Sequence, residues 1–220
     1  MAVNTEQYQR IQAELLASNV TLVAVSKIKP ASDIQALYDL GQRDFGENYV
    51  QELLEKQTRL PIDINWHFIG HLQSNKVKYI APFVHLIHGV DSYNLLKEIN
   101  KQAIKNNRVI NCLLQVHIAQ EETKFGLDEK ELHALLEKAG ELQQVHIKGL
   151  MGMASFSDDE KVVRKEFGAL KKLFDQLKEY RLPHLQAETL SMGMSGDYRM
   201  AIEEGSNMVR IGSLLFGRRG

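Results

Sequence analysis

The sequence of 220 residues contains little cysteine and almost no net charge. Its one cysteine, Cys112, excludes an intramolecular disulfide, and the apolar run around it predicts a buried thiol in a reducing compartment. Lysine and arginine together number 27, against 28 aspartates and glutamates. This balance argues against a surface built to bind polyanions, so we expect no nucleic-acid partner.

Long apolar runs are missing as well. No segment stays apolar for the length of a membrane-spanning helix, and no signal-like apolar run follows the polar residues 1–12. We therefore expect a soluble, cytoplasmic protein that has no membrane partner. Only four prolines are present and no low-complexity stretch divides the chain, so residues 1–220 are expected to form one domain.

Eight short apolar segments alternate with stretches whose apolar residues have helical spacing. This alternation predicts an α/β protein with a parallel sheet. Eight such units can close on themselves, which predicts a (β/α)8 TIM barrel, preceded by an extra N-terminal helix over 4–17. An open, doubly wound sheet is the alternative. The predicted strands cover residues 21–27, 44–48, 65–70, 84–90, 109–118, 146–154, 189–194 and 208–216.

The first predicted strand ends in a lysine. The apolar run 23–25 suits a buried strand, and Pro30 ends it because proline cannot donate to the ladder. Lys27 therefore lies at the carboxyl end of a strand, where α/β proteins place their chemistry. A lysine that is partly desolvated there can act as a nucleophile toward carbonyl groups. The same stretch also fits a lysine whose ammonium group extends into solvent.

Two turns rich in small residues follow the last two predicted strands. Segment 191–197, Ser-Met-Gly-Met-Ser-Gly-Asp, opens a helix, and its small residues let the backbone approach a ligand. Free N–H groups at a helix start favour an anion, and barrels often bind phosphate after strands seven and eight. Arg210 lies in the apolar last strand, so its guanidinium needs a partner from the protein or from a ligand. The candidate binding residues here are Ser191, Ser195, Gly196, Arg210, Gly212 and Ser213.

The histidines do not form a metal-binding pattern. His67 and His71 are four residues apart but lie on a strand and its loop, without the helical geometry that such metal sites use. His85 and His88 are three apart and therefore point to opposite faces of a strand. We expect no metal site.

A lysine and anion-binding turns at the same end of a barrel indicate a phosphorylated aldehyde as the ligand. Pyridoxal 5′-phosphate (PLP) fits, because lysine forms a Schiff base with its aldehyde while the turns bind its phosphate. Asn48 ends the second predicted strand beside this site and offers both a donor and an acceptor.

Six segments, in order along nearly the whole chain, carry a family resemblance. They read Ala-Val-Ser-Lys at 24–27, Phe-Gly-Glu-Asn-Tyr-Val-Gln-Glu at 45–52, Trp-His-Phe-Ile-Gly at 66–70, Leu-Gln-Ser-Asn-Lys at 72–76, Leu-Ser-Met-Gly-Met-Ser at 190–195 and Val-Arg-Ile-Gly at 209–212. Together they resemble the pyridoxal phosphate homeostasis proteins, also called the proline synthetase co-transcribed family. The resemblance implies a single-domain barrel of the alanine-racemase-like type, PLP fold type III.

The resemblance also implies roles for individual residues. It makes Lys27 the Schiff-base lysine and Arg210 the partner of the pyridine nitrogen. It makes Ser195, Gly212 and Ser213 phosphate contacts. The related alanine racemases have a histidine against the cofactor ring, and here Met153 stands at that position. Met153 can pack on the ring but cannot organise an acid–base network.

The resemblance further implies a protein of vitamin B6 homeostasis that holds PLP on Lys27 and buffers it or delivers it to apo PLP-dependent enzymes. We expect a monomer with no catalytic residue of its own. A small PLP-dependent amino-acid racemase is the main alternative, and a sugar-phosphate barrel with an aldolase-type Lys27 is another. Arg210 argues against the racemase, because a guanidinium only donates hydrogen bonds and so leaves a pyridine nitrogen unprotonated. An unprotonated ring is a poorer electron sink.

Overall fold

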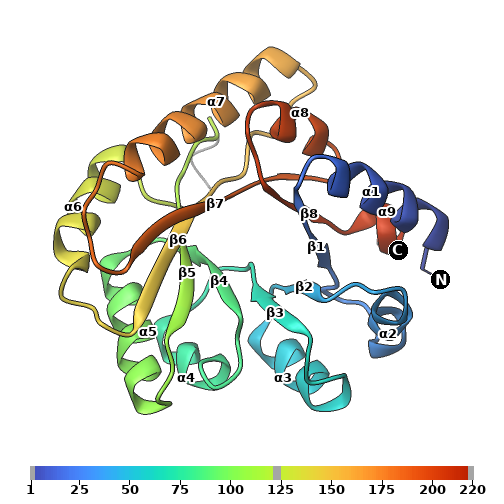
Figure 1. Ribbon diagram of the computed structural model, residues 1–220, viewed down its shortest axis with the longest axis horizontal. Helices are drawn as coiled ribbons and strands as arrows, with labels where there is room; N and C mark the ends of the chain where they lie inside the picture. The colour runs from blue at the N-terminus through green and yellow to red at the C-terminus, as the bar shows by residue number, and fades with distance from the viewer. Residues whose placement is uncertain (1–2, 121–124, 218–220) are drawn as a thin grey trace.

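The computed structural model describes residues 3–120 and 125–217, and these residues form one closed barrel of parallel strands (Figure 1). The strands are β1 (Thr21–Val25), β2 (Asp44–Glu47), β3 (Asn65–Phe68), β4 (Leu86–Val90), β5 (Ile110–Gln115), β6 (Val145–Met151), β7 (Leu185–Met194) and β8 (Met208–Ile211). Each pairs with the next in the sequence, and β8 returns to pair with β1. The predicted (β/α)8 barrel is confirmed, and the open-sheet alternative is wrong because β1 and β8 are hydrogen-bonded neighbours.

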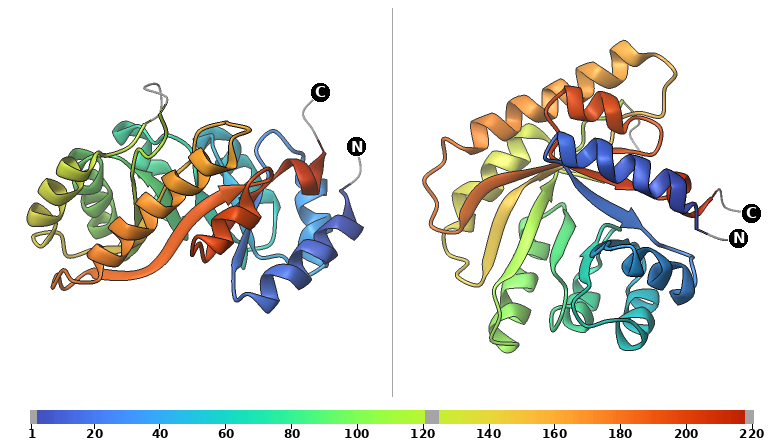
Figure 2. Two further views of the ribbon diagram at one scale, coloured as in Figure 1. Left: turned by 90° about the horizontal axis from the view of Figure 1, so that it is seen from above. Right: turned by 45° about the vertical axis from the view of Figure 1, so that its right-hand side comes forward.

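Helices surround the strands, as the views in Figure 2 show. Some of them begin at residues whose side chains cap the helix. The side chains of Asn4 and Ser92 accept backbone N–H groups in the first turn of their helices. The helices are α1 (Thr5–Ala17), α2 (Ala31–Asp39), α3 (Val50–Arg59), the 3-10 turn η1 (Ser74–Lys76), α4 (Val77–Ile80), α5 (Tyr93–Lys105), α6 (Glu129–Ala139), α7 (Glu160–Leu177), α8 (Tyr198–Glu203) and α9 (Ser213–Phe216).

The end of the chain differs from the prediction. The last predicted strand, 208–216, ends at Ile211, and the residues after Gly212 form the short helix α9. Helix α9 contacts α1, where the backbone N–H of Asn4 donates to the carbonyl oxygen of Leu215 at 2.8 Å. The apolar run that predicts a strand is therefore buried as a helix, because tertiary packing decides its conformation.

Strand β7 is longer than predicted. It begins at Leu185 rather than at residue 189 and pairs there with Ile147 of β6. Its first half alternates between half-buried and exposed residues. Leu185 and Ala187 pack against the edge of the apolar core, but the polar residues between them make this half of the strand hard to recognise from the sequence.

Apolar side chains fill two regions of the barrel. A large cluster lies between the strands and the helices, and it includes Cys112, which is fully buried as predicted. A smaller cluster inside the barrel consists of Val23, Leu86, Leu113, Met151 and Met208. The interior is therefore a packed core rather than a channel.

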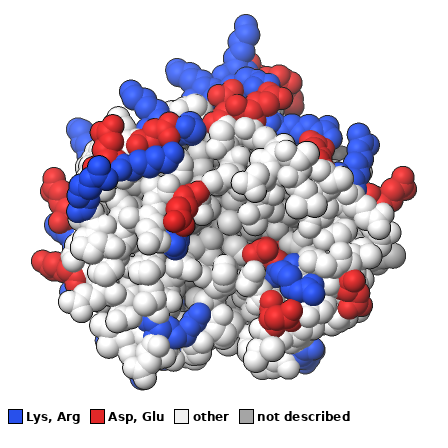
Figure 3. All heavy atoms as spheres, viewed as in Figure 1, with Lys and Arg blue, Asp and Glu red and all other residues white. Residues whose placement is uncertain are grey.

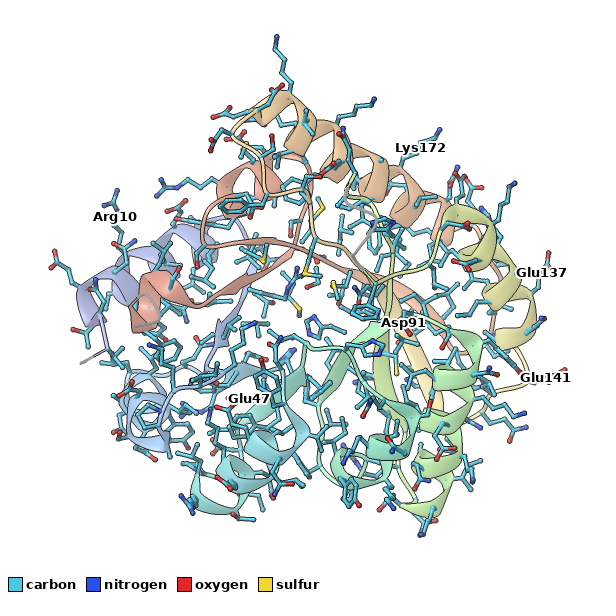
Figure 4. All side chains as sticks on the ribbon, turned by 180° about the vertical axis from the view of Figure 1, so that it is seen from behind. Arg10, Glu47, Asp91, Glu137, Glu141 and Lys172 are labelled. Atoms are coloured by element: carbon cyan, nitrogen blue, oxygen red, sulfur yellow. The ribbon has the colours of Figure 1, made fainter. Side chains whose placement is uncertain are left out.

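The surface mixes charges of both signs. Figure 3 shows lysine and arginine beside aspartate and glutamate around the edge of the face in view. In Figure 4, Arg10, Glu137 and Lys172 extend outward from the outer helices, whereas Glu47 lies among the strands. Within the described residues, no helix combines the length and the apolar character needed to cross a membrane.

Candidate functional site

A cavity of about 490 Å³ lies at the carboxyl ends of the strands. Val25 is the last residue of β1, Met194 is the last of β7, and Asn48 directly follows β2. Because all the strands are parallel, their carboxyl ends meet at this mouth of the barrel. The cavity brings together eight of the nine residues predicted from the sequence, namely Lys27, Asn48, Met153, Ser195, Gly196, Arg210, Gly212 and Ser213.

Lys27 lies in the turn between β1 and α2, where it is partly buried and lines the cavity. Strand β1 ends at Val25, so Lys27 belongs to the turn rather than to the strand. The backbone N–H of Lys29 closes this turn on the carbonyl oxygen of Ser26 at 3.0 Å. The Lys29 ammonium group donates to the carbonyl oxygen of Phe216 at 2.8 Å, which ties Lys29 to α9.

A buried ion pair lies directly behind this turn. Glu47, the last residue of β2, is fully buried, and its Oε1 accepts hydrogen bonds from Ser26 Oγ at 2.6 Å and Lys56 Nζ at 2.7 Å. Lys56 Nζ also donates to the Ser26 carbonyl oxygen at 2.8 Å. Burial raises the pKa of Glu47 by more than the Lys56 and Ser26 contacts lower it. Sequence reasoning missed this pair, since the only signal is one carboxylate in a short strand and a lysine nine residues later.

The residue after Lys27 has an unusual backbone conformation, which side chains of helix α3 stabilise. Ile28 has a φ of 61°, in the left-handed region that β-branched residues rarely adopt. Its backbone N–H donates to Glu52 Oε1 at 2.6 Å, and Lys56 Nζ donates to the same oxygen at 2.6 Å. Two side chains of α3 therefore fix the turn that presents Lys27.

Arg210 lies on β8, the strand next to β1, and lines the cavity, and its guanidinium has partners within the protein. Its Nη1 donates to the carbonyl oxygen of Ser191 at 2.8 Å and to Ser191 Oγ at 2.6 Å. Its Nη2 donates to the carbonyl oxygen of Gly152 at 3.0 Å. Burial lowers the pKa of Arg210 to about 10, so the guanidinium remains charged at neutral pH.

Ser191 is the one predicted residue that does not line the cavity. It is fully buried in β7, and its Oγ lies 3.3 Å from His88 Nδ1 in addition to its contact with Arg210. Strand β7 ends at Met194, as predicted, so Ser191 lies within the strand and not in the turn that follows it. Ser191 therefore affects the cavity through Arg210.

The turns after β7 and β8 meet at the cavity. Ser195 Oγ accepts the backbone N–H of Gly212 at 3.2 Å, which leaves its own proton for another acceptor. A side chain at Gly212 would approach the carbonyl oxygen of Val25 to 3.1 Å, whereas open space surrounds Gly196. Among the described residues, the backbone N–H groups of Gly196 and Ser213 donate to no protein acceptor. These turns thus combine hydrogen-bond donors with little side-chain bulk, as an anion site needs.

Asn48 and Met153 complete the wall. Asn48 Oδ1 is buried and has no hydrogen-bond partner among the described residues. An orphaned acceptor at a cavity wall suits a ligand that donates a hydrogen bond. Met153 is half buried and packs against the apolar cluster inside the barrel. Its thioether suits contact with an aromatic ring.

The chain matches the family model described as alanine racemase, N-terminal domain, over residues 4–220, so the fold and the site define a barrel protein of this class. A pyridoxal phosphate homeostasis protein of Aquifex aeolicus is 46% identical over 202 residues, which cover 90% of this chain and 86% of the relative. The chain belongs to the family of pyridoxal phosphate homeostasis proteins.

Solved structures agree with this assignment. PipY of Synechococcus elongatus PCC7942, in its structure without PLP, is 38% identical with a TM-score of 0.89, over 96% of this chain and 99% of that one. The structure of PipY with PLP bound is 39% identical with a TM-score of 0.83, over 93% and 99%. An alanine racemase of Bartonella henselae, with covalently bound pyridoxal phosphate, is 19% identical with a TM-score of 0.73. It matches 97% of this chain but 59% of the racemase, and this likeness shows the shared fold alone.

Proposed function

We propose that this protein binds PLP through a Schiff base on Lys27 and that it stores the cofactor and hands it to other proteins, without efficient catalysis of its own. One observation carries the proposal: an amine, a buried guanidinium and a turn rich in N–H donors converge on one cavity. The names of the relatives and the PLP bound by PipY support it.

The residues present fit PLP group by group. Lys27 supplies the amine, which condenses with the aldehyde to form a carbon–nitrogen double bond and release water. The donors of Ser195, Gly196 and Ser213 suit the phosphate. The orphaned oxygen of Asn48 suits a hydroxyl donor on the ring. When bound, PLP supplies an aldehyde and an electron-withdrawing ring.

Arg210 supports the view that the bound cofactor reacts little. Its guanidinium is charged and donates only, so it stabilises an unprotonated pyridine nitrogen beside it. An unprotonated ring stabilises a carbanion poorly, and Met153 contributes no acid or base. We expect negligible racemase, decarboxylase and transaminase turnover with common amino acids. A rate near the enzyme median of about 10 s⁻¹ with any of them would contradict the proposal and favour a small PLP enzyme.

The covalent attachment is tested by borohydride reduction. The holo-protein is reduced and digested, and the pyridoxyl adduct is located by mass spectrometry. We expect the adduct on Lys27, and the Lys27→Ala variant should lose the visible absorption band. Lys29→Ala is the matched control, because Lys29 lines the same cavity and is two residues away. An adduct mainly on Lys29 would refute the assignment.

The delivery role is supported by the exposure of the cavity rim. Phe156 is 99% exposed and Met194 is 37% exposed, and Gly196 and Ser213 are exposed as well. A rim of this kind lets an incoming amine reach the cofactor and replace Lys27 without accumulation of free aldehyde. It also permits release, whereas a covered site retains its ligand.

Direct transfer is tested by mixing holo-protein with an apo PLP enzyme in the presence of a scavenger for free PLP. We expect the enzyme to regain activity faster than the spontaneous release of PLP allows. Recovery at the rate of spontaneous release would eliminate direct transfer and leave only passive buffering.

We further propose that the protein acts in the cytoplasm as a monomer. Light scattering should give a mass near 25.1 kDa, and a dimer mass would overturn that part.

A further inference from the structure

A chain of hydrogen-bonded side chains crosses the barrel interior below Arg210. Arg210 Nη1 lies 2.6 Å from Ser191 Oγ, and Ser191 Oγ lies 3.3 Å from His88 Nδ1. His88 Nε2 lies 2.9 Å from His67 Nδ1, and His67 Nε2 lies 2.9 Å from Asp44 Oδ1. Five strands contribute one residue each, and all members except Asp44 are at most 4% exposed. Asp44 begins β2, so the chain starts at the end of the barrel opposite the cavity.

If both histidines are neutral, the two ends of this chain fix the direction of every hydrogen bond. Arg210 can only donate, so Ser191 Oγ accepts from it, and an ionised Asp44 can only accept, so His67 Nε2 carries a proton. The Ser191 hydroxyl then donates to His88 Nδ1, and His88 Nε2–H donates to His67 Nδ1. Each of these two hydrogen bonds thus has one donor and one acceptor. Both histidines are neutral in this arrangement, and both carry the proton on Nε2.

The ionisation states agree with this arrangement. Burial would raise the pKa of Asp44, but its contacts with His67, above all the hydrogen bond, outweigh burial, and the pKa falls below its usual value. Burial, with the neighbouring His67 and Arg210, lowers the pKa of His88 well below its ordinary value. At neutral pH the chain therefore has an anion at one end, a cation at the other and neutral imidazole at His88.

We propose that Asp44, His67 and His88 are positioning residues for the cofactor site, which act by fixing the Ser191 hydroxyl and thereby the guanidinium of Arg210. The contacts with Ser191 and Gly152 occupy three of the five guanidinium N–H groups. The other two have no acceptor among the residues that the structure describes and are available to a ligand in the cavity. The identity of that ligand rests on the proposed function, whereas the hydrogen-bond direction does not.

The same end of the barrel offers a competing interpretation. Ligand atoms of Asp44, His67 and His85 lie within 4.8 Å of one another, close enough to surround a metal ion. A metal on His67 Nε2 would replace the proton that bonds Asp44 and would move the His67 proton to Nδ1. The tautomer of His67 therefore distinguishes the hydrogen-bonded chain from a metal site.

The first experiment reads these tautomers by NMR of the imidazole nitrogens in ¹⁵N-labelled, ligand-free protein treated with a chelator. We expect a proton on Nε2 and none on Nδ1 in both His67 and His88. His85→Leu should leave both sets of signals in place, because His85 is exposed and outside the chain. A proton on Nδ1 of either histidine would overturn the proposal, whether or not PLP binds.

The second experiment compares PLP with an analogue whose ring nitrogen is replaced by C–H. If Arg210 donates to that nitrogen, the wild-type protein should prefer PLP by at least about tenfold. His88→Leu should reduce this preference to less than about threefold, whereas His85→Leu should retain it. A folded His88→Leu protein with the full preference would refute the positioning role.

The other end of the chain provides a second pair of variants. Asp44 is partly exposed, so Asp44→Leu tests the same prediction if His88→Leu does not fold. Asp44→Asn keeps an acceptor for His67 and should preserve the preference that Asp44→Leu loses. Equal preferences in these two variants would contradict the proposal. If the wild-type protein binds neither ligand, the proposed function fails while the NMR result still decides the hydrogen-bond direction.

Discussion

Replacing Lys56 with methionine tests the buried ion pair behind the Lys27 turn. Lys56 is 7% exposed and Glu47 is 0% exposed by side chain, so neither charge can recover its hydration without moving. Methionine retains the length and apolar packing of the lysine stem and removes only the charge and its donors. The change therefore isolates the electrostatic part of the interaction.

The expected cost follows from what the substitution leaves behind. Glu47 Oε2 already has no partner among the described residues, and Oε1 would keep only the Ser26 hydroxyl. Removing one member of a buried pair costs about 3–5 kcal/mol of unfolding free energy, because the other charge stays buried and unpaired. The additional Glu47→Gln change removes that charge, so the double variant should recover at least about half of the loss.

The loss should also depend on pH. Glu47 has a raised pKa in the folded state, and a carboxyl of this kind stabilises the fold below its ordinary pKa and loses that contribution as pH rises through the raised value. Without Lys56 the pKa of Glu47 rises further. The destabilisation by Lys56→Met should therefore be smaller near about pH 5, where Glu47 is more protonated, than near about pH 8.

Urea unfolding, followed by circular dichroism and by the fluorescence of the buried Trp66, measures these free energies. Lys171→Met is the matched control, because Lys171 pairs with Asp175 on the exposed surface of α7. It should cost less than about 0.5 kcal/mol. A Lys56→Met cost no greater than that of the control, or one that does not change with pH, would refute the reasoning.

Three further predictions follow from single residues. Ile28→Asn should stabilise the fold by about 0.5–1 kcal/mol in urea unfolding, since asparagine tolerates positive φ, as at Asn19 and Asn107; no gain would show that the turn is unstrained. Ser195→Ala should weaken PLP by about tenfold more than pyridoxal, which lacks the phosphate, and equal losses in a binding titration would contradict this placement. Burial raises the pKa of the Cys112 thiol, so it should react with a thiol reagent only after unfolding, and rapid reaction of the native protein would disprove that.

Local signals in the sequence were sufficient for the barrel and for most of the cavity. Pro30 shows that the first strand stops before it, and in a parallel barrel the carboxyl ends of the strands all lie at one mouth. A residue that directly follows a strand therefore lies near this mouth, regardless of its contacts with residues that are distant in the sequence. Lys27, Asn48 and Ser195 could therefore be predicted without the structure.

Interactions between distant strands could not be predicted in this way. The expectation that His85 and His88 point to opposite faces of a strand is not confirmed, because His85 precedes β4 and the rings of both histidines lie close to that of His67, at 5.3 and 5.1 Å. The contact between His88 and His67 joins residues 21 positions apart on neighbouring strands. No local pattern specifies it, since it arises only when the barrel closes. The buried Glu47–Lys56 pair has the same origin.

The two missed networks explain how the cavity keeps its shape. The Glu47–Lys56 pair contacts the turn of Lys27, and the chain that includes Ser191 contacts Arg210. A buried polar group that loses its partner costs about 1–3 kcal/mol, so neither network rearranges easily. The Lys27 turn and Arg210 are thus both held by bonds within the protein. A ligand that binds therefore loses little free energy in ordering the side chains of Lys56 and Arg210, and a ligand that leaves breaks only its own contacts. These bonds and the exposed rim support the proposal that the cavity binds a small cofactor and releases it again.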